Sequence, residues 1–480
     1  MAYKISFGTD GWRGVIAEDY TFDNVRRAAQ GFASYLVEKG NGGKWIVVSH
    51  DKRFHSENFA AAAAEVLAAN GLNVYLTDGA TPTPVIAYAV VDKKACGAVN
   101  ITASHNPPTD NGFKVRDENG GAIDPEGLKR IEALIPDSAE EVKRISLNEG
   151  MRDGKIVIFD ASEAYVEHLH ELVDIQGIKD AGFTIMVDAM WGNGAGWFTK
   201  LLEGGKTRVV EIHNERNTLF PDMRRPEPIP PNINVGLQAT VKNNADILLV
   251  TDGDADRCGV GDESGNFINQ MQVYALLAYY LLELRGWSGP LVKTTTTTQM
   301  VDDLANKYNV PVYTVKIGFK HAAPKMIEVN ALMAGEESGS YAFRGLPERD
   351  GILAGLFLLD FMQKINSKAS GLLEKVESVI GKYYFKRQDI AVDANSRKAI
   401  QEFLVSEKIL KENAVDNIDL SDGVKYVYNN GDWLFFRFSG TEPVIRIAAE
   451  TKDQKRVEEL LQRGVNLILS KTNLKRGNNG

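Results

Sequence analysis

A short loop that begins at Ser104 places a serine where it could accept a chemical group. The apolar, β-branched run at residues 98–101 predicts a strand, and Ser104, His105 and Asn106 follow it before two prolines that restrict the backbone. If the loop is extended, His105 points away from Ser104, and the serine has no base beside it. Such a serine can still accept an activated group, for example a phosphoryl group. A plain surface turn explains the composition of this loop equally well.

Three carboxylates alternate directly after the apolar run at residues 247–250, at Asp252, Asp254 and Asp256 (the aspartate trio). A spacing of two in extended backbone places them on one side, where they repel one another. A divalent cation relieves this repulsion, and ligation by oxygen alone favours magnesium over a bare turn. A calcium-binding EF-hand loop does not fit, because Arg257 stands where that loop needs glycine and a strand precedes the motif.

The segment 335–339 offers two carboxylates and a hydroxyl group between glycines. Glu336 and Ser338 provide the acceptor and donor groups that sugar hydroxyls need. Taken alone, however, a plain loop with helix-capping residues is the simpler interpretation of this segment.

A phosphate-binding loop is indicated at residues 437–443, between two strand-like runs. Arg437 supplies a guanidinium group, Ser439 and Thr441 supply hydroxyl groups, and Gly440 leaves backbone amides open to an anion. A capped hairpin would explain the glutamate and proline that follow, but it does not explain Arg437.

Two further segments are weaker candidates. Residues 7–14 pack glycines around Asp10 and Arg13, which either lets a ligand approach the backbone closely or forms a plain turn. Lys293 precedes five threonines that are most simply a strand end and a helix cap, although the lysine could reach a cleft.

The composition limits the class of protein. With 480 residues, 44% of them hydrophobic and 25% charged, the chain should form three or four globular domains. A net charge of −9 argues against nucleic acid as the main partner. Two cysteines suit a reducing compartment, and the most apolar run, at residues 274–284, is too short to span a bilayer. We therefore expect a cytoplasmic protein without a membrane partner.

The elements that position these groups recur three times along the chain. The predicted strands lie at residues 45–48, 73–77 and 98–101, at 184–187, 208–212 and 247–250, and at 291–292, 310–315 and 331–334. Helix-like segments separate them, as in α/β units, and a loop rich in polar groups follows the third strand of each copy. Since such sheets bind ligands beyond the carboxyl ends of their strands, three similar domains could direct these loops into one cleft. The last hundred residues predict an α+β unit with a hairpin.

The motifs together resemble one known family. Thr-Ala-Ser-His-Asn-Pro at 102–107, Asp-Gly-Asp-Ala-Asp-Arg at 252–257, Gly-Glu-Glu-Ser-Gly at 335–339 and Arg-Phe-Ser-Gly-Thr-Glu-Pro at 437–443 occur in the order seen in the α-D-phosphohexomutases. This resemblance covers nearly the whole chain. It implies three similar mixed-sheet α/β/α domains and a C-terminal α+β domain, similar to the TATA-binding protein, around a central cleft. We place these domains at residues 1–155, 156–258, 259–375 and 376–480.

The same resemblance implies a role for each matching residue. Ser104 would be the phosphoserine that gives and regains the phosphoryl group, and it would hold Mg²⁺ together with the aspartate trio. Lys114 would be the general base, with His105 as a supporting polar group. Arg257 and Arg13 would contact the transferring phosphate. The substrate would be bound by a wider set: Lys293, Glu336, Ser338, Arg437, Ser439, Gly440 and Thr441.

The implied activity is a mutase that interconverts hexose 1-phosphate and hexose 6-phosphate, with hexose 1,6-bisphosphate as intermediate and activator. Glucose is the expected sugar, and mannose a second one. Four positions depart from patterns within the family and leave the sugar open: Glu337, Ser340, Leu346 and Arg349. The alternatives are a phosphoglucosamine mutase, then a sugar-phosphate phosphatase or a non-enzymatic binding module. We expect a small-molecule sugar phosphate as partner and a monomer or small homo-oligomer.

Overall fold

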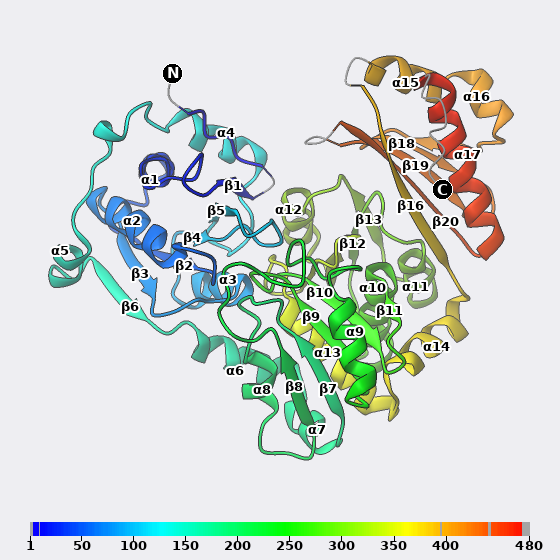
Figure 1. Ribbon diagram of the computed structural model, residues 1–480, viewed down its shortest axis with the longest axis horizontal. Coiled ribbons are helices and arrows are strands. Elements are labelled where there is room, and N and C mark those ends of the chain that lie inside the picture. Colours follow the sequence, from blue (N-terminus) through cyan, green and yellow to red (C-terminus); the bar gives the residue numbers. More distant parts are fainter. Residues whose placement is uncertain (1–2, 9, 394–395, 440–442, 473–480) are drawn as a thin grey trace.

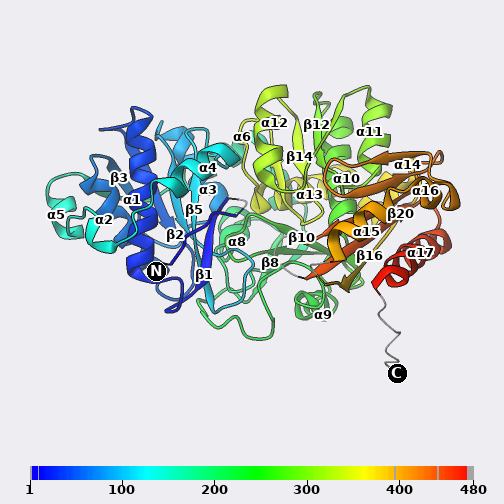
Figure 2. The same cartoon turned by 90° about the horizontal axis from the view of Figure 1, so that it is seen from above.

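The computed structural model describes residues 3–8, 10–393, 396–439 and 443–472. These residues form four units, each built on its own β-sheet, and Figure 1 shows them in chain order from blue to red. Figure 2 shows the first unit and the C-terminal unit at opposite ends of the molecule, with the second and third between them. Among the described helices, none combines the length and apolar character needed to cross a membrane.

The first sheet has six strands. In spatial order they are β1 (Gly11–Val15), β5 (Asp110–Arg116), β4 (Ala98–Ile101), β2 (Trp45–His50), β3 (Asn73–Thr77) and β6 (Ile156–Phe159). Its helices are α1 (Phe22–Glu38), α2 (Ser56–Ala69), α3 (Thr83–Asp92), α4 (Pro125–Ala133) and α5 (Leu147–Arg152), with a 3₁₀ turn at Ala139–Glu141. The Thr21 side chain caps α1 by accepting a hydrogen bond from the Asn24 amide.

The second sheet runs in the order β11 (Phe267–Ile268), β10 (Cys258–Asp262), β9 (Ile247–Thr251), β7 (Thr184–Asp188) and β8 (Arg208–Ile212). Its helices are α6 (Ser162–Leu172), α7 (Ile175–Asp180), α8 (Trp197–Leu202) and α9 (Asn234–Lys242). The third sheet runs β13 (Val312–Val315), β12 (Leu291–Thr294), β14 (Met333–Gly335) and β15 (Tyr341–Phe343). Its helices are α10 (Gln270–Tyr279, continued by a π turn at Tyr280–Leu284), α11 (Met300–Tyr308), α12 (Phe319–Val329), α13 (Gly351–Ile365) and α14 (Ala369–Ile380).

These three sheets share one topology. In each, the first predicted strand (β2, β7 or β12) is flanked by the second and third strands in parallel, and an antiparallel strand follows beside the third. The loops that carry Ser104, the aspartate trio and Glu336 all leave the carboxyl end of the third strand. The repeat predicted from the sequence is therefore present, and it places equivalent loops at equivalent sheet edges.

Two expected domain boundaries fall beside edge strands. β6 pairs with β3 and so completes the first sheet, although residue 156 was expected to open the second domain. β10 and β11 likewise complete the second sheet beyond residue 258. The composition of an edge strand does not specify which of two neighbouring sheets it joins.

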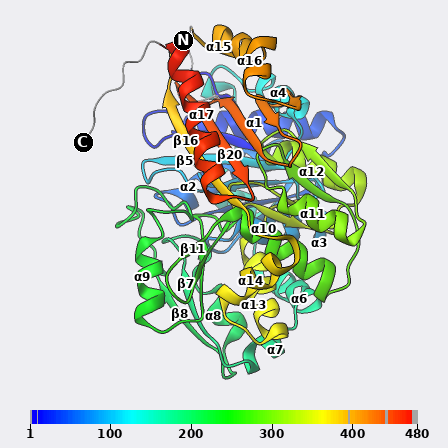
Figure 3. The same cartoon turned by 90° about the vertical axis from the view of Figure 1, so that its right-hand side faces the viewer.

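The C-terminal unit is an antiparallel sheet covered by helices. Its strands lie in the order β16 (Tyr384–Ala391), β20 (Val444–Thr451), β19 (Trp433–Phe438), β18 (Val424–Val427) and β17 (Asn417–Asp419). The predicted hairpin is present, with Val427 paired to Trp433 across the turn. Helices α15 (Arg397–Leu404), α16 (Glu407–Glu412) and α17 (Gln454–Thr472) complete the unit, and Figure 3 shows α17 packed along β16 and β20.

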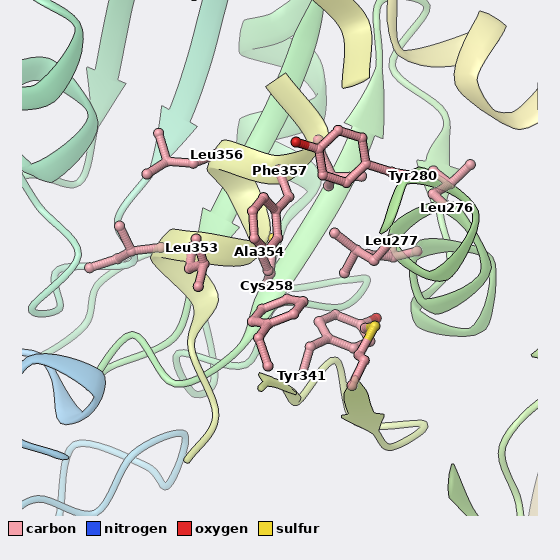
Figure 4. Close-up of a cluster of buried hydrophobic side chains, with 14 of the residues drawn as sticks. Cys258, Leu276, Leu277, Tyr280, Tyr341, Leu353, Ala354, Leu356 and Phe357 are labelled. Carbon is pink, nitrogen blue, oxygen red and sulfur yellow. The ribbon is translucent and has the colours of Figure 1, made fainter. Parts of the chain in front are cut away.

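The second and third units share a hydrophobic core. α13 is buried along most of its length, and it contacts α7 and β9 of the second unit as well as α10 of the third. Figure 4 shows Leu353 and Phe357 of α13 in one cluster with Cys258 of β10 and Tyr341 of β15. Close packing of this kind resists relative movement, so the two units present their loops in a fixed relation.

Candidate active site

Ser104 lies at the contact between the first and second units, with only 1% of its surface exposed. Its Oγ donates a hydrogen bond of 2.6 Å to Oδ2 of Asp252, which belongs to the second unit. The serine has a φ of +49°, in the left-handed region. Because the backbone turns here instead of running extended, His105 Nδ1 lies 3.2 Å from the Ser104 hydroxyl. The expectation that His105 points away from Ser104 was wrong for this reason.

The aspartate trio forms the one cluster of metal-ligating side chains found among the described residues, with one oxygen of each carboxylate within 4.8 Å of the others. All three side chains are fully buried. Oδ1 of Asp252 accepts hydrogen bonds from the backbone amides of Asp256 and Arg257. Oδ2 of Asp254 accepts from Thr83 at 2.6 Å and from Lys114 at 2.8 Å. The protein thus fixes Asp252 through both carboxylate oxygens and Asp254 through Oδ2.

The remaining oxygens fit a hard cation. Oδ1 of Asp254 and Oδ1 of Asp256 are buried without a hydrogen-bond partner. A buried acceptor without a donor is unfavourable, and carboxylate oxygens are the ligand type that Mg²⁺ prefers. The trio could therefore bind a metal ion, as its spacing predicted.

Burial and neighbouring charges shift the pKa values of two aspartates of the trio. Burial, followed by repulsion from Asp256 and Asp254, raises the pKa of Asp252 well above its usual value. Burial also acts to raise the pKa of Asp254, but Lys114, the Thr83 hydrogen bond and Arg349 together outweigh it, and the net pKa lies below the usual value. One carboxylate is thus held ionised while its neighbour is pushed toward its neutral form until a cation is present.

Lys114 lies on β5, opposite Asn100 of β4. Its Nζ is within 3.5 Å of carboxylate oxygens of Asp10, Asp254 and Asp256. Burial lowers the pKa of Lys114, but attraction to these three carboxylates more than offsets it and the net pKa is raised. In this arrangement the ammonium group neutralises negative charge on the three carboxylates. Its role as a general base stays a prediction.

Two arginines surround the serine loop. The Arg13 guanidinium donates to Oδ1 of Asn106 at 2.6 Å, and Arg257 Nη2 lies 3.5 Å from His105 Nε2. Burial, then Arg257 and Arg13, lower the pKa of His105 well below its usual value, so its imidazole is neutral at pH 7. The structure thus brings together the residues predicted to handle a transferring phosphate.

The loop at residues 335–339 after β14, which is predicted to bind sugar (the sugar loop), is joined by backbone pairing to the segment that follows the aspartate trio. Arg257 forms a β-bridge with Ser340, and the amide of Cys258 donates to the Gly339 carbonyl at 2.9 Å. Glu336 is buried and accepts a hydrogen bond of 2.8 Å from the Gly318 amide, while the Ser338 hydroxyl contacts Ser340. Ser340, which Ser338 contacts, therefore connects this loop to Arg257.

The C-terminal unit contributes more distant groups. Arg437 on β19 is paired with Arg446 on β20, so the two arginines occupy adjacent positions on neighbouring strands. Arg437 contacts Asp422 at 3.3 Å, and Ser439 is buried directly after β19. The predicted residues Gly440 and Thr441 lie outside the described part of the chain. From β16, Arg387 reaches to 3.7 Å from Glu337 of the sugar loop.

Lys293 is not brought to this cluster. Its ammonium group contacts the Asp302 carboxylate and lies 3.2 Å from the Thr298 carbonyl, inside the third unit. Lysine has a long, flexible side chain, so its position at a strand end did not determine its direction.

Arg349, expected only as a departure from family patterns, joins the buried charges of this site. It comes from the third unit, directly before α13, and its Nη2 lies 2.6 Å from Asp10 and 3.0 Å from Asp256. Glu348 beside it pairs with Arg116 of β5. Three units therefore meet at one buried network of alternating charges. The run Pro-Glu-Arg-Asp before an apolar helix was the signal that could have indicated it.

Replacement of Arg349 by methionine should destabilise the protein strongly. Breaking a buried ion pair by removing one partner costs about 3–5 kcal/mol, because Asp10 and Asp256 would lose a compensating charge. Urea unfolding should show this loss, and Arg349→Lys should recover part of it. Arg130→Met removes an exposed pair with Glu38 and should change little. Equal effects of the Arg349 and Arg130 variants would contradict a buried network.

The repeated α/β units and a buried serine facing a carboxylate cluster, with arginines around both, are the parts of a phosphoryl-transfer enzyme. Comparison with known proteins agrees. Family models described as phosphoglucomutase/phosphomannomutase match domain by domain: alpha/beta/alpha domains I, II and III at residues 4–142, 163–265 and 269–379, and the C-terminal domain at 389–466. The chain belongs to this family, and it is a mutase, an intramolecular phosphotransferase.

Individual relatives cover nearly the whole chain. A phosphoglucomutase/phosphomannomutase of Thermococcus kodakarensis is 32% identical over 96% of this chain and 98% of its own. A probable phosphoglucosamine mutase of Pyrococcus abyssi is 31% identical over 96% of this chain and 97% of its own. The crystal structure of a putative phosphomannomutase from Thermus thermophilus superposes with a TM-score of 0.84, at 33% identity, over 98% of this chain and 100% of its own. The family resemblance and the expected four-domain fold are confirmed.

Proposed function

We propose that this protein interconverts hexose 1-phosphate and hexose 6-phosphate through a phosphoserine at Ser104, with glucose as the preferred sugar. The observation that carries the proposal is the 2.6 Å contact between the Ser104 hydroxyl and Asp252. It supports the proposal because the serine hydroxyl of one domain lies against the carboxylate cluster of the next, in buried surroundings. In such surroundings water is excluded, and phosphoryl transfer to a sugar is favoured over hydrolysis.

The reaction has two mirrored transfers. In the first, the bond between phosphorus and Oγ of phosphorylated Ser104 breaks, a bond forms to O6 of the sugar 1-phosphate, and the O6 proton passes to a base while Oγ takes up a proton. The hexose 1,6-bisphosphate then turns over. In the second transfer the bond between phosphorus and O1 breaks, a bond forms to Oγ, which loses its proton, and O1 takes up a proton, which leaves hexose 6-phosphate. Lys114 is the proposed base: its Nζ lies within 3.1 Å of Asp254 and Asp256, and because these carboxylates keep it protonated, it can accept the O6 proton only after it has passed its own proton to one of them.

The charges of the site suit this reaction. Oδ1 of Asp254, Oδ1 of Asp256 and a carboxylate oxygen of Asp252 would hold Mg²⁺, which when bound neutralises negative charge on the phosphoryl group. Arg257 and Arg13 add positive charge on the other side of the serine loop. Phosphoryl transfer depends mainly on such positioning and neutralisation.

The substrate is proposed to bridge two regions. Glu336 and Ser338 would bind sugar hydroxyls, and the C-terminal domain would bind the phosphate that does not react, through Arg437 and Ser439. One phosphate cradle must serve both ends of the bisphosphate, so this domain would open and close between the two transfers.

Removal of the Arg437 side chain should weaken substrate binding more than it slows phosphoryl transfer. Charge-assisted hydrogen bonds contribute about 1.5–3 kcal/mol, so Arg437→Met should raise the KM for glucose 1-phosphate about 10- to 100-fold. The change in kcat should be smaller, because this phosphate is held equally before and during transfer. Steady-state kinetics test this, with Arg456→Met of α17 in the same domain as a control that should keep the normal KM. An unchanged KM in the Arg437 variant would remove this arginine from the substrate site.

The preferred sugar is tested by comparing reaction rates with three sugar phosphates. Initial rates with glucose, mannose and glucosamine 1-phosphates, each started with a trace of the matching bisphosphate, should be highest for glucose. Two of the relatives described above differ in the sugar that their names specify, so a faster rate with glucosamine 1-phosphate would identify the alternative, a phosphoglucosamine mutase. Absence of turnover with every hexose phosphate would refute the proposed function.

A further inference from the structure

Arg53 is a buried arginine that neither the predicted nor the described chemistry uses. It follows β2 in the first domain, and 1% of its surface is exposed. Burial of a guanidinium group without strong compensation is unfavourable, so its partners must account for its presence.

The guanidinium group binds the backbone of the Ser104 loop at four points. Nη2 donates to the carbonyl oxygens of Ser104 at 2.7 Å and Asn106 at 2.6 Å. Nη1 donates to those of Pro107 at 2.7 Å and Asp110 at 3.0 Å. One side chain therefore gathers four carbonyl groups of a single loop, and the planar fork of arginine is suited to this geometry.

The loop needs this support at Ser104 itself. The serine has a φ of +49°, and the left-handed region costs a residue with a side chain about 1–2 kcal/mol. Its carbonyl also meets the second domain, since a Cβ placed on Gly253 would lie 2.4 Å from that oxygen. The Ser104 peptide is thus confined between Arg53 on one side and Gly253 on the other.

Arg53 is itself held in place. Its Nε lies 3.2 Å from the buried Asp51 carboxylate, which also accepts from the Arg53 amide and the Ser56 hydroxyl. The Phe220 ring of the second domain lies 4.9 Å from the guanidinium carbon. Rigid support of this kind is what a precisely placed nucleophile requires.

We propose that Arg53 is a positioning residue for the nucleophile: it holds the Ser104 peptide in its left-handed conformation, so that Oγ faces Asp252. This inference rests on the proposed role of Ser104 as the group that is phosphorylated. The guanidinium group of Arg53 contacts the carbonyl groups of the loop, so it would act through the loop backbone.

The test compares Arg53 with Arg27, another buried arginine of the first domain that donates to the carbonyls of Pro136 and Tyr3, away from Ser104. Arg53→Lys and Arg53→Met should lower kcat for glucose 1-phosphate about 100-fold, as a displacement of the nucleophile by about 1 Å would. The KM should stay within about threefold of normal, because the sugar site is unchanged. Phosphorylation of Ser104 by glucose 1,6-bisphosphate, followed by intact-protein mass, should slow by the same factor.

Arg27→Lys and Arg27→Met provide the structural comparison, since they should lower the thermal midpoint without changing kcat of the folded protein. Equal kcat losses in the lysine variants at positions 53 and 27, each corrected for folded protein, would overturn the inference. So would an unchanged rate of Ser104 phosphorylation in Arg53→Lys. Failure of the function itself is distinguishable, because Ser104 would then remain unphosphorylated in the wild-type protein too.

Discussion

Replacement of Ser104 by alanine should abolish mutase turnover while the protein remains folded. Loss of a covalent nucleophile typically lowers kcat by about four to six orders of magnitude. The hydroxyl group is buried and donates to Asp252, so its removal leaves one carboxylate oxygen without that donor. Magnesium can take over the same oxygen, and the thermal midpoint should therefore change by only a few degrees. A coupled assay for glucose 6-phosphate and a thermal melt of the same sample measure both quantities.

A matched serine variant makes this result specific. Ser370 donates a part-buried hydrogen bond of 2.6 Å to Glu263 in another part of the fold, so Ser370→Ala should keep full turnover. Residual activity above about 1% of normal in Ser104→Ala would contradict the phosphoserine proposal, given the loss expected for a nucleophile. It would favour a binding module or a mechanism in which the phosphoryl group passes directly between substrates.

Weakening of metal binding at the aspartate trio should have the second largest effect on turnover. We expect EDTA to stop turnover and added magnesium to restore it, because the trio is the proposed source of the neutralising cation. Asp254→Asn removes one negative charge and keeps the shape of the side chain. The magnesium concentration for half-maximal activity should then rise about 100-fold, since loss of groups that support a metal ligand already costs about 10–100-fold. Titration of activity with magnesium measures this shift.

Asp262 provides the control for the metal prediction. It lies at the far end of β10 in the same sheet, and its Oδ1 accepts from the amides of Ser264 and Asn266. Asparagine can make the same contacts, so Asp262→Asn should leave the magnesium requirement unchanged. Full activity in EDTA, or equal magnesium curves for the two variants, would show that the trio is not a metal site.

Much of the fold could be predicted because it depends on local patterns. Three sets of β-branched runs, each separated by helix-like segments, predicted three similar sheets, and the strands β4, β9 and β14 lie where those runs are. The topology then determines that the loops after them emerge at corresponding edges. The trio followed from the spacing alone, since its members are four residues apart at most and share one loop. A site of this kind can be predicted from the sequence because the residues that form it are close neighbours along the chain.

Other features depended on contacts between distant segments. β17, at the outer edge of the C-terminal sheet, has only three residues, and it becomes a strand because β18 pairs with it. Arg349 pairs with Asp10 across 339 positions of sequence, and no local pattern specifies such a partner. The Lys293 side chain pairs with Asp302 within its own domain, because a long, flexible side chain can reach partners that its position on the strand does not specify.

The sequence by itself determined the kind of groups present and the order of the loops that carry them. Only the tertiary structure decided how Ser104 faces Asp252 and why His105 lies beside it. The reason is physical: a left-handed residue with a side chain is unfavourable by itself, and it persists where surrounding groups hold it. Here those groups are Arg53, 51 positions earlier, and Gly253 in the next domain.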